Sequence, residues 1–319
     1  MVVLNTITVK GTHNGTEQIE IECSQLIMGT GDFFKLELDQ AFAILDDFVE
    51  AGGNLIDTAH GYIKAEEIVG KWLQLRNFRD KIIILSKGAH PDDGEPGNRV
   101  TPTAITKDLT ESLERFNTNY IDLYALHRDD LTVEVGPIID VLNEHIVAGR
   151  ILAIGASNWT HQRIQEANEY AEKNGLIGFT FSSTNLSLAK CNEPRWEGCV
   201  SVDAAALNWH KDNKLPLLSW SSQAGGFFSG NFTEKNPDNE DMVRVYYSRE
   251  NWERYSRAEI LSKEKQVSPI QIALAYVLNQ SFQTAAIIGP ATVEEFNSSL
   301  QGTEIKLTEQ EIDWLDLSV

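Results

Sequence analysis

Four side chains that can hold or transfer a proton lie where short apolar segments of the chain end. They are Asp57, Tyr62, Lys87 and His127, and Tyr62 stands five residues after the acid. In a protein of repeated strand–helix units, the carboxyl ends of the strands display the catalytic side chains. We therefore expect these four residues at one edge of a sheet, as a group suited to proton transfer.

The same residue types indicate how the group would work. A buried lysine needs an anionic partner, and Asp57 is the expected partner of Lys87. A cation beside a phenol favours the ionised phenol, so Lys87 is expected to lower the pKa of Tyr62 and make it a better acid. His127 would donate a hydrogen bond to the oxygen that receives the proton. The group would thus polarise and protonate a carbonyl as a hydride reaches its carbon.

Each residue also has a structural interpretation when it is taken alone. Asp57 can be a turn residue or a helix cap, Tyr62 can be a packing residue, and a single lysine or histidine at a strand end is commonly structural. The catalytic interpretation depends on their joint occurrence at the ends of the second, third and fourth expected strands.

Composition limits the classes of partner. The chain of 319 residues is 42% hydrophobic and can bury a large core, and we expect one domain over residues 1–319. Its 47 acidic and 27 basic residues give a formal net charge of −20. Such a surface repels phosphate backbones and anionic lipids, so neither nucleic acid nor a membrane surface is an expected partner.

The termini and cysteines predict a cytoplasmic protein. Residues 1–6 lack the basic start and long apolar stretch of a secretory signal, and no apolar stretch approaches the roughly 20 residues that span a bilayer. Cys23, Cys191 and Cys199 cannot all pair, and their spacing matches no zinc or redox motif. Reduced structural thiols and no metal site are expected.

Periodicity predicts the architecture. Segments 6–9 and 18–21 alternate around Asn14-Gly15, which indicates a hairpin that covers one end of the fold. After it, eight apolar strands and several amphipathic helices follow one another. The expected strands are 25–29, 54–57, 82–87, 121–127, 151–157, 179–186, 215–220 and 285–289, and the expected helices are 39–50, 65–75, 103–116, 135–148, 161–173 and 308–315.

Eight strands separated by helices favour parallel pairing and closure into an α/β fold, the (βα)8 TIM barrel. A doubly wound open sheet is the alternative, but no Gly-x-Gly-x-x-Gly follows an early strand. Two long segments, 191–214 and 221–257, follow strands six and seven. Long loops after barrel strands lie on the catalytic face, so we expect both to form walls of a pocket.

Four motifs in order identify a resemblance. Asp57-Thr58-Ala59-His60-Gly61-Tyr62 matches the pattern Asp-Thr-Ala-x-x-Tyr, and Ser86-Lys87 matches a Ser-Lys pair at the third strand. Residues 122–127 match Asp-Leu-Tyr-x-x-His, and residues 155–158 match Gly-x-Ser-Asn. With these motifs, the chain resembles the aldo-keto reductase family from residue 29 to residue 289.

The resemblance implies reduction of an aldehyde or ketone by NADPH or NADH, and the reverse oxidation of an alcohol. By position, Tyr62 would be the proton donor, Lys87 and Asp57 would tune it, and His127 would orient the carbonyl. The partner implied is a small carbonyl or alcohol compound, sugar-like compounds included. The sequence specifies no oligomeric state.

The resemblance also implies a cofactor site. Ser157 and Asn158 would hold the nicotinamide carboxamide, Trp220 would stack on the nicotinamide ring, and the loop 221–230 would wrap the pyrophosphate. The full set carried over by position is Thr30, Asp57, Ser157, Asn158, Ser183, Trp220, Ser221, Gly225, Gly289, Glu295 and Ser299.

Three departures from the family pattern matter, and the third bears on the choice of cofactor. Ile63 replaces a glycine, and Ser183 replaces a glutamine that contacts the carboxamide. Residues 287–295 contain no cation for an adenosine 2′-phosphate, and Glu294 and Glu295 are acidic. Because a carboxylate repels a phosphate but accepts a hydrogen bond from a ribose hydroxyl, both NAD(H) and NADP(H) remain candidates.

The expected substrate contacts are aromatic: Phe33, His60, Trp159 and Trp196, with Phe34 beside them. Aromatic walls suit apolar and sugar-like carbonyl compounds alike. Two other functions are weighed against a reductase. One is a redox-sensing or regulatory subunit that binds the cofactor with little turnover. The other is a metal-dependent barrel hydrolase that uses Asp57, His60 and His127, although no His-x-His follows the first strand.

Overall fold

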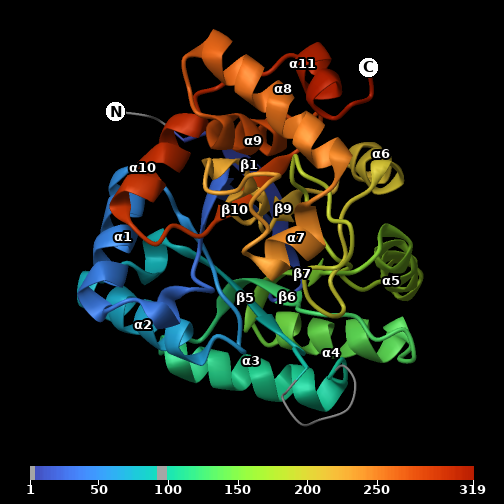
Figure 1. The fold of residues 1–319 in the computed structure, drawn as a ribbon. Coiled ribbons are helices and arrows are strands. Elements are labelled where there is room, and N and C mark those ends of the chain that lie inside the picture. Colours follow the sequence, from blue (N-terminus) through green and yellow to red (C-terminus); the bar gives the residue numbers. More distant parts are fainter. Residues whose placement is uncertain (1–3, 92–98) are drawn as a thin grey trace.

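The computed structural model describes residues 4–91 and 99–319; residues 1–3, the start of the segment inspected for a secretory signal, lie outside them. Within the described residues, eight parallel strands close a barrel in the order β10-β3-β4-β5-β6-β7-β8-β9, surrounded by helices (Figure 1). The (βα)8 barrel is confirmed, and the open sheet is excluded. The strands are β3 (Leu26–Gly29), β4 (Leu55–Asp57), β5 (Ile83–Gly88), β6 (Ile121–Leu126), β7 (Ile151–Ser157), β8 (Phe181–Ser183), β9 (Leu217–Ser219) and β10 (Thr284–Ile288).

The helices begin and end at residues with local reasons to do so. The side chains of Thr101, Thr160 and Asp203 accept hydrogen bonds from first-turn amides, as N-caps do. Asn77 and Asn117 end two helices in the left-handed conformation. All six expected helices form, to within two residues at each end: α1 (Leu38–Glu50), α2 (Ile63–Arg76), α3 (Pro102–Phe116), α4 (Val135–Val147), α5 (His161–Asn174) and α11 (Glu309–Leu315).

The barrel interior is filled by alternate residues of the strands. Leu55, Leu85 and Leu123 point inward and belong to one buried cluster with Phe181. Gly155 leaves the room that the Phe181 ring takes, because a Cβ there would lie 2.4 Å from the ring. Since side chains alternate along a strand, the next inward positions are 57 and 87 on the first two strands, and 125 and then 127 after Leu123.

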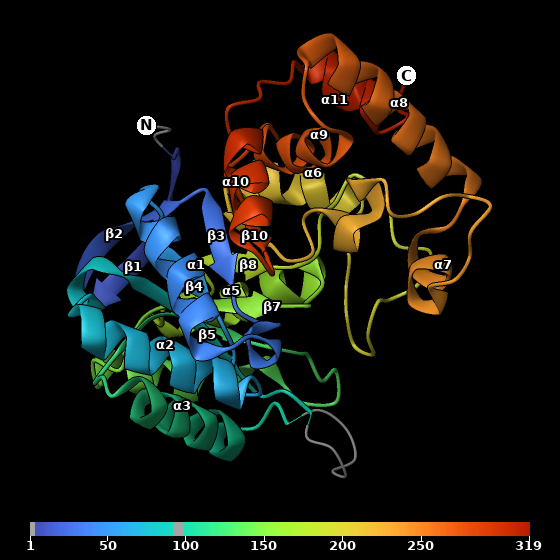
Figure 2. The same ribbon diagram turned by 60° about the vertical axis from the view of Figure 1, so that its left-hand side comes forward.

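The N-terminal hairpin closes the end of the barrel at which the strands begin, opposite the end where residues 57, 87 and 127 lie. Its strands β1 (Thr6–His13) and β2 (Glu17–Ser24) pair antiparallel, and the turn contains Asn14 and Gly15, both at positive φ. Apolar residues of both strands, Val9 and Ile21 among them, pack in the same cluster as the barrel interior. Figure 2 shows the hairpin at one end and α7 (Glu240–Tyr246) at the other. The expected cover is confirmed.

The two long segments differ from the loops that we expected. The first contains α6 (Ala204–Asn213), and the second contains the short η3 (Ala224–Ser229), α7 and α8 (Arg249–Lys265). α9 (Pro269–Leu278) and α10 (Val293–Gly302) complete the ring. α8 is highly charged, and its apolar residues recur only at three-residue spacing, although Ser248 caps its start and its side chain accepts from the amide of Asn251. β8 is shorter than expected because the chain leaves the ladder after Ser183, where the amide of Leu186 bonds to the hydroxyl of Ser219 at 2.7 Å.

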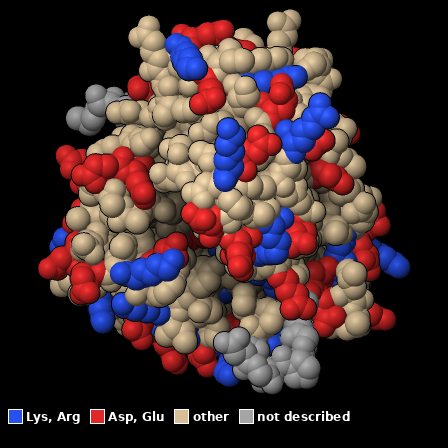
Figure 3. All heavy atoms as spheres, viewed as in Figure 1, with Lys and Arg blue, Asp and Glu red and all other residues tan. Residues whose placement is uncertain are grey.

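Figure 3 shows the face of Figure 1 with acidic side chains spread over it and a hollow near its centre. In the part of the chain that the structure describes, no helix is both long and apolar enough to cross a membrane. Cys23, Cys191 and Cys199 all carry free thiols.

His210 of α6 is a buried histidine that the fold holds neutral. Its Nδ1 lies 3.0 Å from the carbonyl oxygen of Leu215, which can only accept, so Nδ1 carries the proton. Its ring stacks on Phe282 with centroids 5.6 Å apart. Burial lowers the pKa of His210 from 6.5 to about 4.

This shift predicts a pH-dependent stability. Between pH 6.5 and about 4 the unfolded chain binds a proton at residue 210 that the folded chain does not, so acidification favours unfolding. At about pH 4.5 the contribution reaches ~2–3 kcal/mol relative to pH 7. We expect His210→Gln to lose less stability than the wild type between these pH values in urea unfolding. His13→Gln, at an exposed histidine, is the control and should behave as the wild type. Equal pH dependence in all three proteins would contradict the assignment.

Candidate functional site

A buried ion pair joins two neighbouring strands at the open end of the barrel. Asp57 ends β4 and Lys87 lies near the end of β5, and the two strands pair in parallel. Nζ of Lys87 donates to Oδ1 of Asp57 and, at 2.9 Å, to the carbonyl oxygen of Thr58. Both side chains are buried, so each charge depends on the other. The partner expected for Lys87 from the sequence is the one observed. Burial raises the pKa of the Asp57 carboxyl, and the ammonium of Lys87 opposes this effect.

The backbone after Asp57 places Tyr62. The amide of Thr58 donates to the carbonyl of Leu85 at 2.9 Å, and the amide of His60 donates to that of Lys87 at 2.8 Å. The chain therefore continues alongside β5 before it turns. Tyr62 then immediately precedes α2, and its amide bonds to the carbonyl of Ala59 at 2.8 Å.

His127 faces Tyr62 from the end of β6, two strands along the barrel from β4. It follows β6 directly, and its amide bonds to the carbonyl of Gly88 at 2.8 Å. The rings of Tyr62 and His127 meet edge to face with centroids 5.7 Å apart. Nδ1 of His127 is buried and has no hydrogen-bond partner among residues 4–91 and 99–319. Burial, with the positive charge of Lys87, lowers the pKa of His127 well below 6.5, so the imidazole is neutral.

The pKa of Tyr62 corrects one expectation. We expected Lys87 to lower it, but burial raises it above the ordinary value of a phenol, and the charge of Asp57 adds to this effect. The main reason is burial, which disfavours the charged phenolate, and of the Asp57–Lys87 pair it is the carboxylate whose charge acts on Tyr62. The cation that does lower the pKa of Tyr62 is Arg128. The phenol consequently stays protonated at neutral pH.

Arg128 is a residue of this site that the sequence interpretation missed. Its guanidinium donates to the carbonyls of His127, at 2.9 Å, and of Glu197, at 3.1 Å. It thereby links the end of β6 to the segment after β8. The signal that could have identified it is a cation directly after His127, at a strand end of an acidic chain.

A second set of buried charges supports the segment 58–66 from behind. Glu66 is fully buried in α2 and accepts hydrogen bonds from Ser86 at 2.7 Å, Ser112 at 2.8 Å and Arg115 at 2.7 Å. Arg115 also donates to the carbonyl of His60 at 2.8 Å. α2 and α3 are thus tied to β5 and to the backbone that carries Tyr62.

The structure brings together the three residues expected at the carboxamide. The hydroxyl of Ser157 donates to the carbonyl of Ser183 at 2.7 Å. The side-chain amide of Asn158 donates to the hydroxyl of Ser157 and to the backbone carbonyl of His127, both at 3.1 Å. Its side-chain oxygen accepts from the backbone amide of Val200 at 3.3 Å. The side chains of Ser157 and Asn158 are therefore engaged by the protein. The hydroxyl of Ser183 is buried and has no partner in the described residues.

The other expected cofactor residues surround the same end of the barrel. Trp220 follows β9, its ring lies 5.8 Å from that of Trp196, and its buried Nε1 has no hydrogen-bond partner within the described chain. Ser221 and Gly225 both take positive φ in the loop after β9. The hydroxyl of Thr30 is engaged, because it donates to the carbonyl of Asp57 at 3.0 Å.

Beyond β10, the expected residues lie on and around α10. Gly289 has open space around its Cα, and Ser299 is buried in α10. Glu295 is exposed, and its carboxylate accepts from the amide of Ala291 at 2.7 Å, so it caps the start of the helix. Glu294 beside it is exposed as well.

Burial separates the expected substrate contacts into two groups. Phe33 and Trp159 are each 1% exposed and pack in the core, and the ring of His60 bonds to Glu111 at 2.7 Å. These three side chains are occupied by packing and by α3, which argues against direct contact with a substrate. Trp196 is 50% exposed and Phe34 is 55% exposed, so these two remain available.

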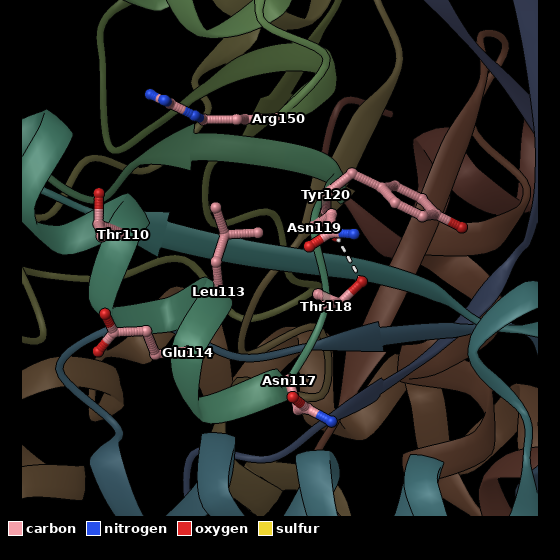
Figure 4. A pocket seen from close by; sticks show the side chains of 8 residues that line it. All are labelled: Thr110, Leu113, Glu114, Asn117, Thr118, Asn119, Tyr120 and Arg150. Atoms are coloured by element: carbon pink, nitrogen blue, oxygen red, sulfur yellow. Dashed lines mark hydrogen bonds between the residues drawn. The ribbon is translucent and has the colours of Figure 1, made fainter.

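A wide groove lies elsewhere on the molecule. It measures about 680 Å³ and is formed by α3, by the turn 117–120 before β6, and by Arg150 before β7 (Figure 4). All these residues precede the amino ends of strands, so the groove belongs to the end of the barrel opposite Tyr62.

Among the residues that the structure describes, no group of three or more His, Cys, Asp or Glu side chains is arranged to hold a metal ion.

The chain is similar to known proteins over most of its length. The model of the aldo/keto reductase family matches residues 25–318. An uncharacterized oxidoreductase of Bacillus subtilis, YrpG, is 28% identical over 304 residues, which cover 91% of this chain and 90% of that protein. Norsolorinic acid reductase B of Aspergillus parasiticus is 28% identical over 89% of this chain and 75% of its own. The aldo-keto reductase ausK of Aspergillus calidoustus is 26% identical over 90% of this chain and 74% of its own.

The buried ion pair makes a testable contribution to stability. Lys87→Met removes the cation and leaves the Asp57 carboxylate buried without it, which we expect to cost about 3–5 kcal/mol of unfolding free energy. Adding Asp57→Asn to this variant removes the stranded charge and should recover part of the loss. Urea unfolding measures both, with Lys10→Met, at an exposed lysine of the hairpin, as the control. A Lys87→Met protein as stable as the Lys10→Met protein would refute the pairing.

Proposed function

Because the chain belongs to the aldo/keto reductase family, we propose that it is an NAD(P)H-dependent oxidoreductase that reduces an aldehyde or ketone to an alcohol, and runs the reaction in reverse. The observation that carries the proposal is the convergence of a buried Asp57–Lys87 pair, a protonated Tyr62 and a neutral His127 at the open end of the barrel. Each of these groups has one task in a carbonyl reduction.

Tyr62 is the proposed proton donor. As a hydride adds to the carbonyl carbon, the electron pair of the C=O bond moves to oxygen, and the phenol proton passes to that oxygen. The phenolate that remains is stabilised by the nearby charge of Arg128. Uptake of a proton from solvent then restores the phenol, so the overall reaction consumes one hydride and one proton.

His127 is proposed to orient the carbonyl. A neutral imidazole donates from one nitrogen, and the carbonyl oxygen can accept. Nδ1 is buried and free within the described residues, and burial keeps the ring neutral. Neutrality is useful here because an imidazolium would compete with Tyr62 as the acid.

The protein offers unpartnered polar groups where a nicotinamide dinucleotide would bind. The hydroxyls of Thr58 and Ser183 and the Nε1 of Trp220 are buried without a partner in the described chain, and all three follow or end barrel strands. Buried polar groups are normally hydrogen-bonded, so such a group of them indicates a ligand. Bound there, the cofactor would supply the hydride. Of the three residues expected at the carboxamide, Ser157 and Asn158 bond to the protein through their side chains. The proposed carboxamide contact is therefore the hydroxyl of Ser183, which has no partner in the described chain.

The proposed substrate is a small carbonyl compound with a flat apolar surface. Trp196 and Phe34 expose aromatic rings in segments that follow barrel strands. Such rings receive either an aromatic body or the apolar face of a sugar. One relative is named for the reduction of norsolorinic acid.

Tyr62→Phe tests the proton donor. Removing the hydroxyl should lower carbonyl reduction by about 10²–10⁴-fold, because general acid catalysis contributes that much. The dissociation constant for the cofactor should stay within about twofold, since the ring remains. Steady-state rates over a panel of aldehydes and ketones, with fluorescence titration of NADH and NADPH, give both quantities.

The control for this variant is Tyr120→Phe, which lies at the opposite end of the barrel. Full activity in Tyr62→Phe would remove Tyr62 from the acid role. Tight cofactor binding by the wild type with no turnover across the panel would instead favour a cofactor-binding regulatory subunit.

Glu294→Arg tests the cofactor preference. The acidic start of α10 is proposed to disfavour an adenosine 2′-phosphate and to tolerate the ribose hydroxyl of NADH. Reversing the charge should raise the NADPH/NADH ratio of kcat/KM by about tenfold or more. Glu309→Arg makes the same change in the first turn of α11 and should leave the ratio unaltered. An unchanged ratio in Glu294→Arg would place the 2′ position away from α10.

A further inference from the structure

A guanidinium in the segment between β8 and α6 has buried nitrogens with nothing to bind. Nε and Nη1 of Arg195 are buried, and neither has a hydrogen-bond partner among the described residues. Arg195 is half-buried, and two buried donors of a cation without acceptors are unfavourable, so their retention indicates an anion that belongs there.

Two acidic side chains near this segment pair with another arginine: Glu193 with Arg244 at 2.8 Å, and Asp241 with Arg244 at 3.0 Å. Glu197, two residues after Arg195, is exposed and forms no ion pair with it among the described residues. Arg244 also donates to the backbone carbonyls of Pro194 and Arg195, at 3.1 and 2.9 Å. Through Arg244, α7 therefore holds the backbone of Arg195 in place, and the guanidinium of Arg195 stays available to a ligand.

The guanidinium lies directly over the loop that follows β9. A Cβ at Gly225 would lie 2.3 Å from Nη1 of Arg195, so only a glycine leaves room for the guanidinium there. Ala224, Gly225 and Gly226 all take positive φ at the start of η3, which forms a tight turn beneath the arginine. The segments that follow two adjacent strands, β8 and β9, thus meet at one point.

The surroundings place this point beside the proposed nicotinamide site. The guanidinium carbon lies 4.9 Å from the centre of the Trp196 ring, and that ring lies 5.8 Å from the ring of Trp220. On the other side lies the buried hydroxyl of Tyr246, which interacts with the guanidinium of Arg195. Burial raises the pKa of Tyr246 and the charge of Arg195 opposes this effect, so the hydroxyl is a neutral donor in the field of the guanidinium.

We propose that Arg195 binds the diphosphate of the dinucleotide, so that the segment after β8 supplies the cation for the loop after β9. This inference rests on the proposed function. A planar guanidinium can donate two parallel hydrogen bonds to phosphate oxygens. In a chain with a formal net charge of −20, a local cation is needed to offset the repulsion of a diphosphate. The bound diphosphate would also tie the segment 191–203 to the loop 221–230.

The test compares Arg195→Gln with Arg249→Gln, which removes one positive charge from an exposed site. Dissociation constants for NADH, NADPH and inorganic pyrophosphate are measured by titration calorimetry, with pyrophosphate also used as a competitor of the dinucleotide. We expect Arg195→Gln to weaken dinucleotide and pyrophosphate binding by about 10–100-fold, Arg195→Lys to weaken both less, and Arg249→Gln to match the wild type.

Two further outcomes separate this inference from the proposed function. Dinucleotide binding by the wild type that is unchanged in Arg195→Gln overturns the role of Arg195 and leaves the function standing. No dinucleotide binding by the wild type overturns the proposed function itself. Circular dichroism confirms folding; if Arg195→Gln fails to fold, Arg195→Lys must weaken pyrophosphate binding relative to Arg249→Gln for the inference to hold.

Discussion

The Asp57–Lys87 ion pair is the interaction on which the rest of the site depends. Two opposite charges are held away from water at the inward edge of adjacent barrel strands, and each is tolerable only because of the other. The same burial sets the state of the groups around them. Burial keeps Tyr62 protonated and His127 neutral, so the open end of the barrel contains one charge-balanced pair and two neutral polar rings.

This arrangement requires a rigid frame, and the barrel supplies it. The apolar interior below the pair, with Leu55 and Leu85 at the preceding inward positions, fixes the height of Asp57 and Lys87 along the barrel axis. Behind them, Glu66 joins α2 and α3 to β5 through Ser86, Ser112 and Arg115. A network in which every member is hydrogen-bonded gives a unique position to the backbone that carries Tyr62.

The acidic surface places different demands on the two ends of the proposed cofactor. At the diphosphate, a cation is needed, and Arg195 is held ready by Arg244 and by the space above Gly225. At the far ribose, Glu294 and Glu295 stand at the start of α10 and are proposed to select against a further phosphate. In an acidic protein, a single cation at the diphosphate thus offsets repulsion of the cofactor, and acidic side chains at the ribose discriminate against a 2′-phosphate.

The sequence by itself determined the barrel, the hairpin that covers it, and the inward edge on which Asp57, Lys87 and His127 lie. It could do so because strand and helix periods are local, and a period of two decides which face of a strand a residue occupies. Tertiary structure decided what lies between segments: the burial of Phe33 and Trp159, the bond from His60 to Glu111, the raised pKa of Tyr62, and the position of Arg195 over Gly225. These depend on how long loops fold back over a closed barrel, and neither distances across it nor burial can be read from spacing along the chain.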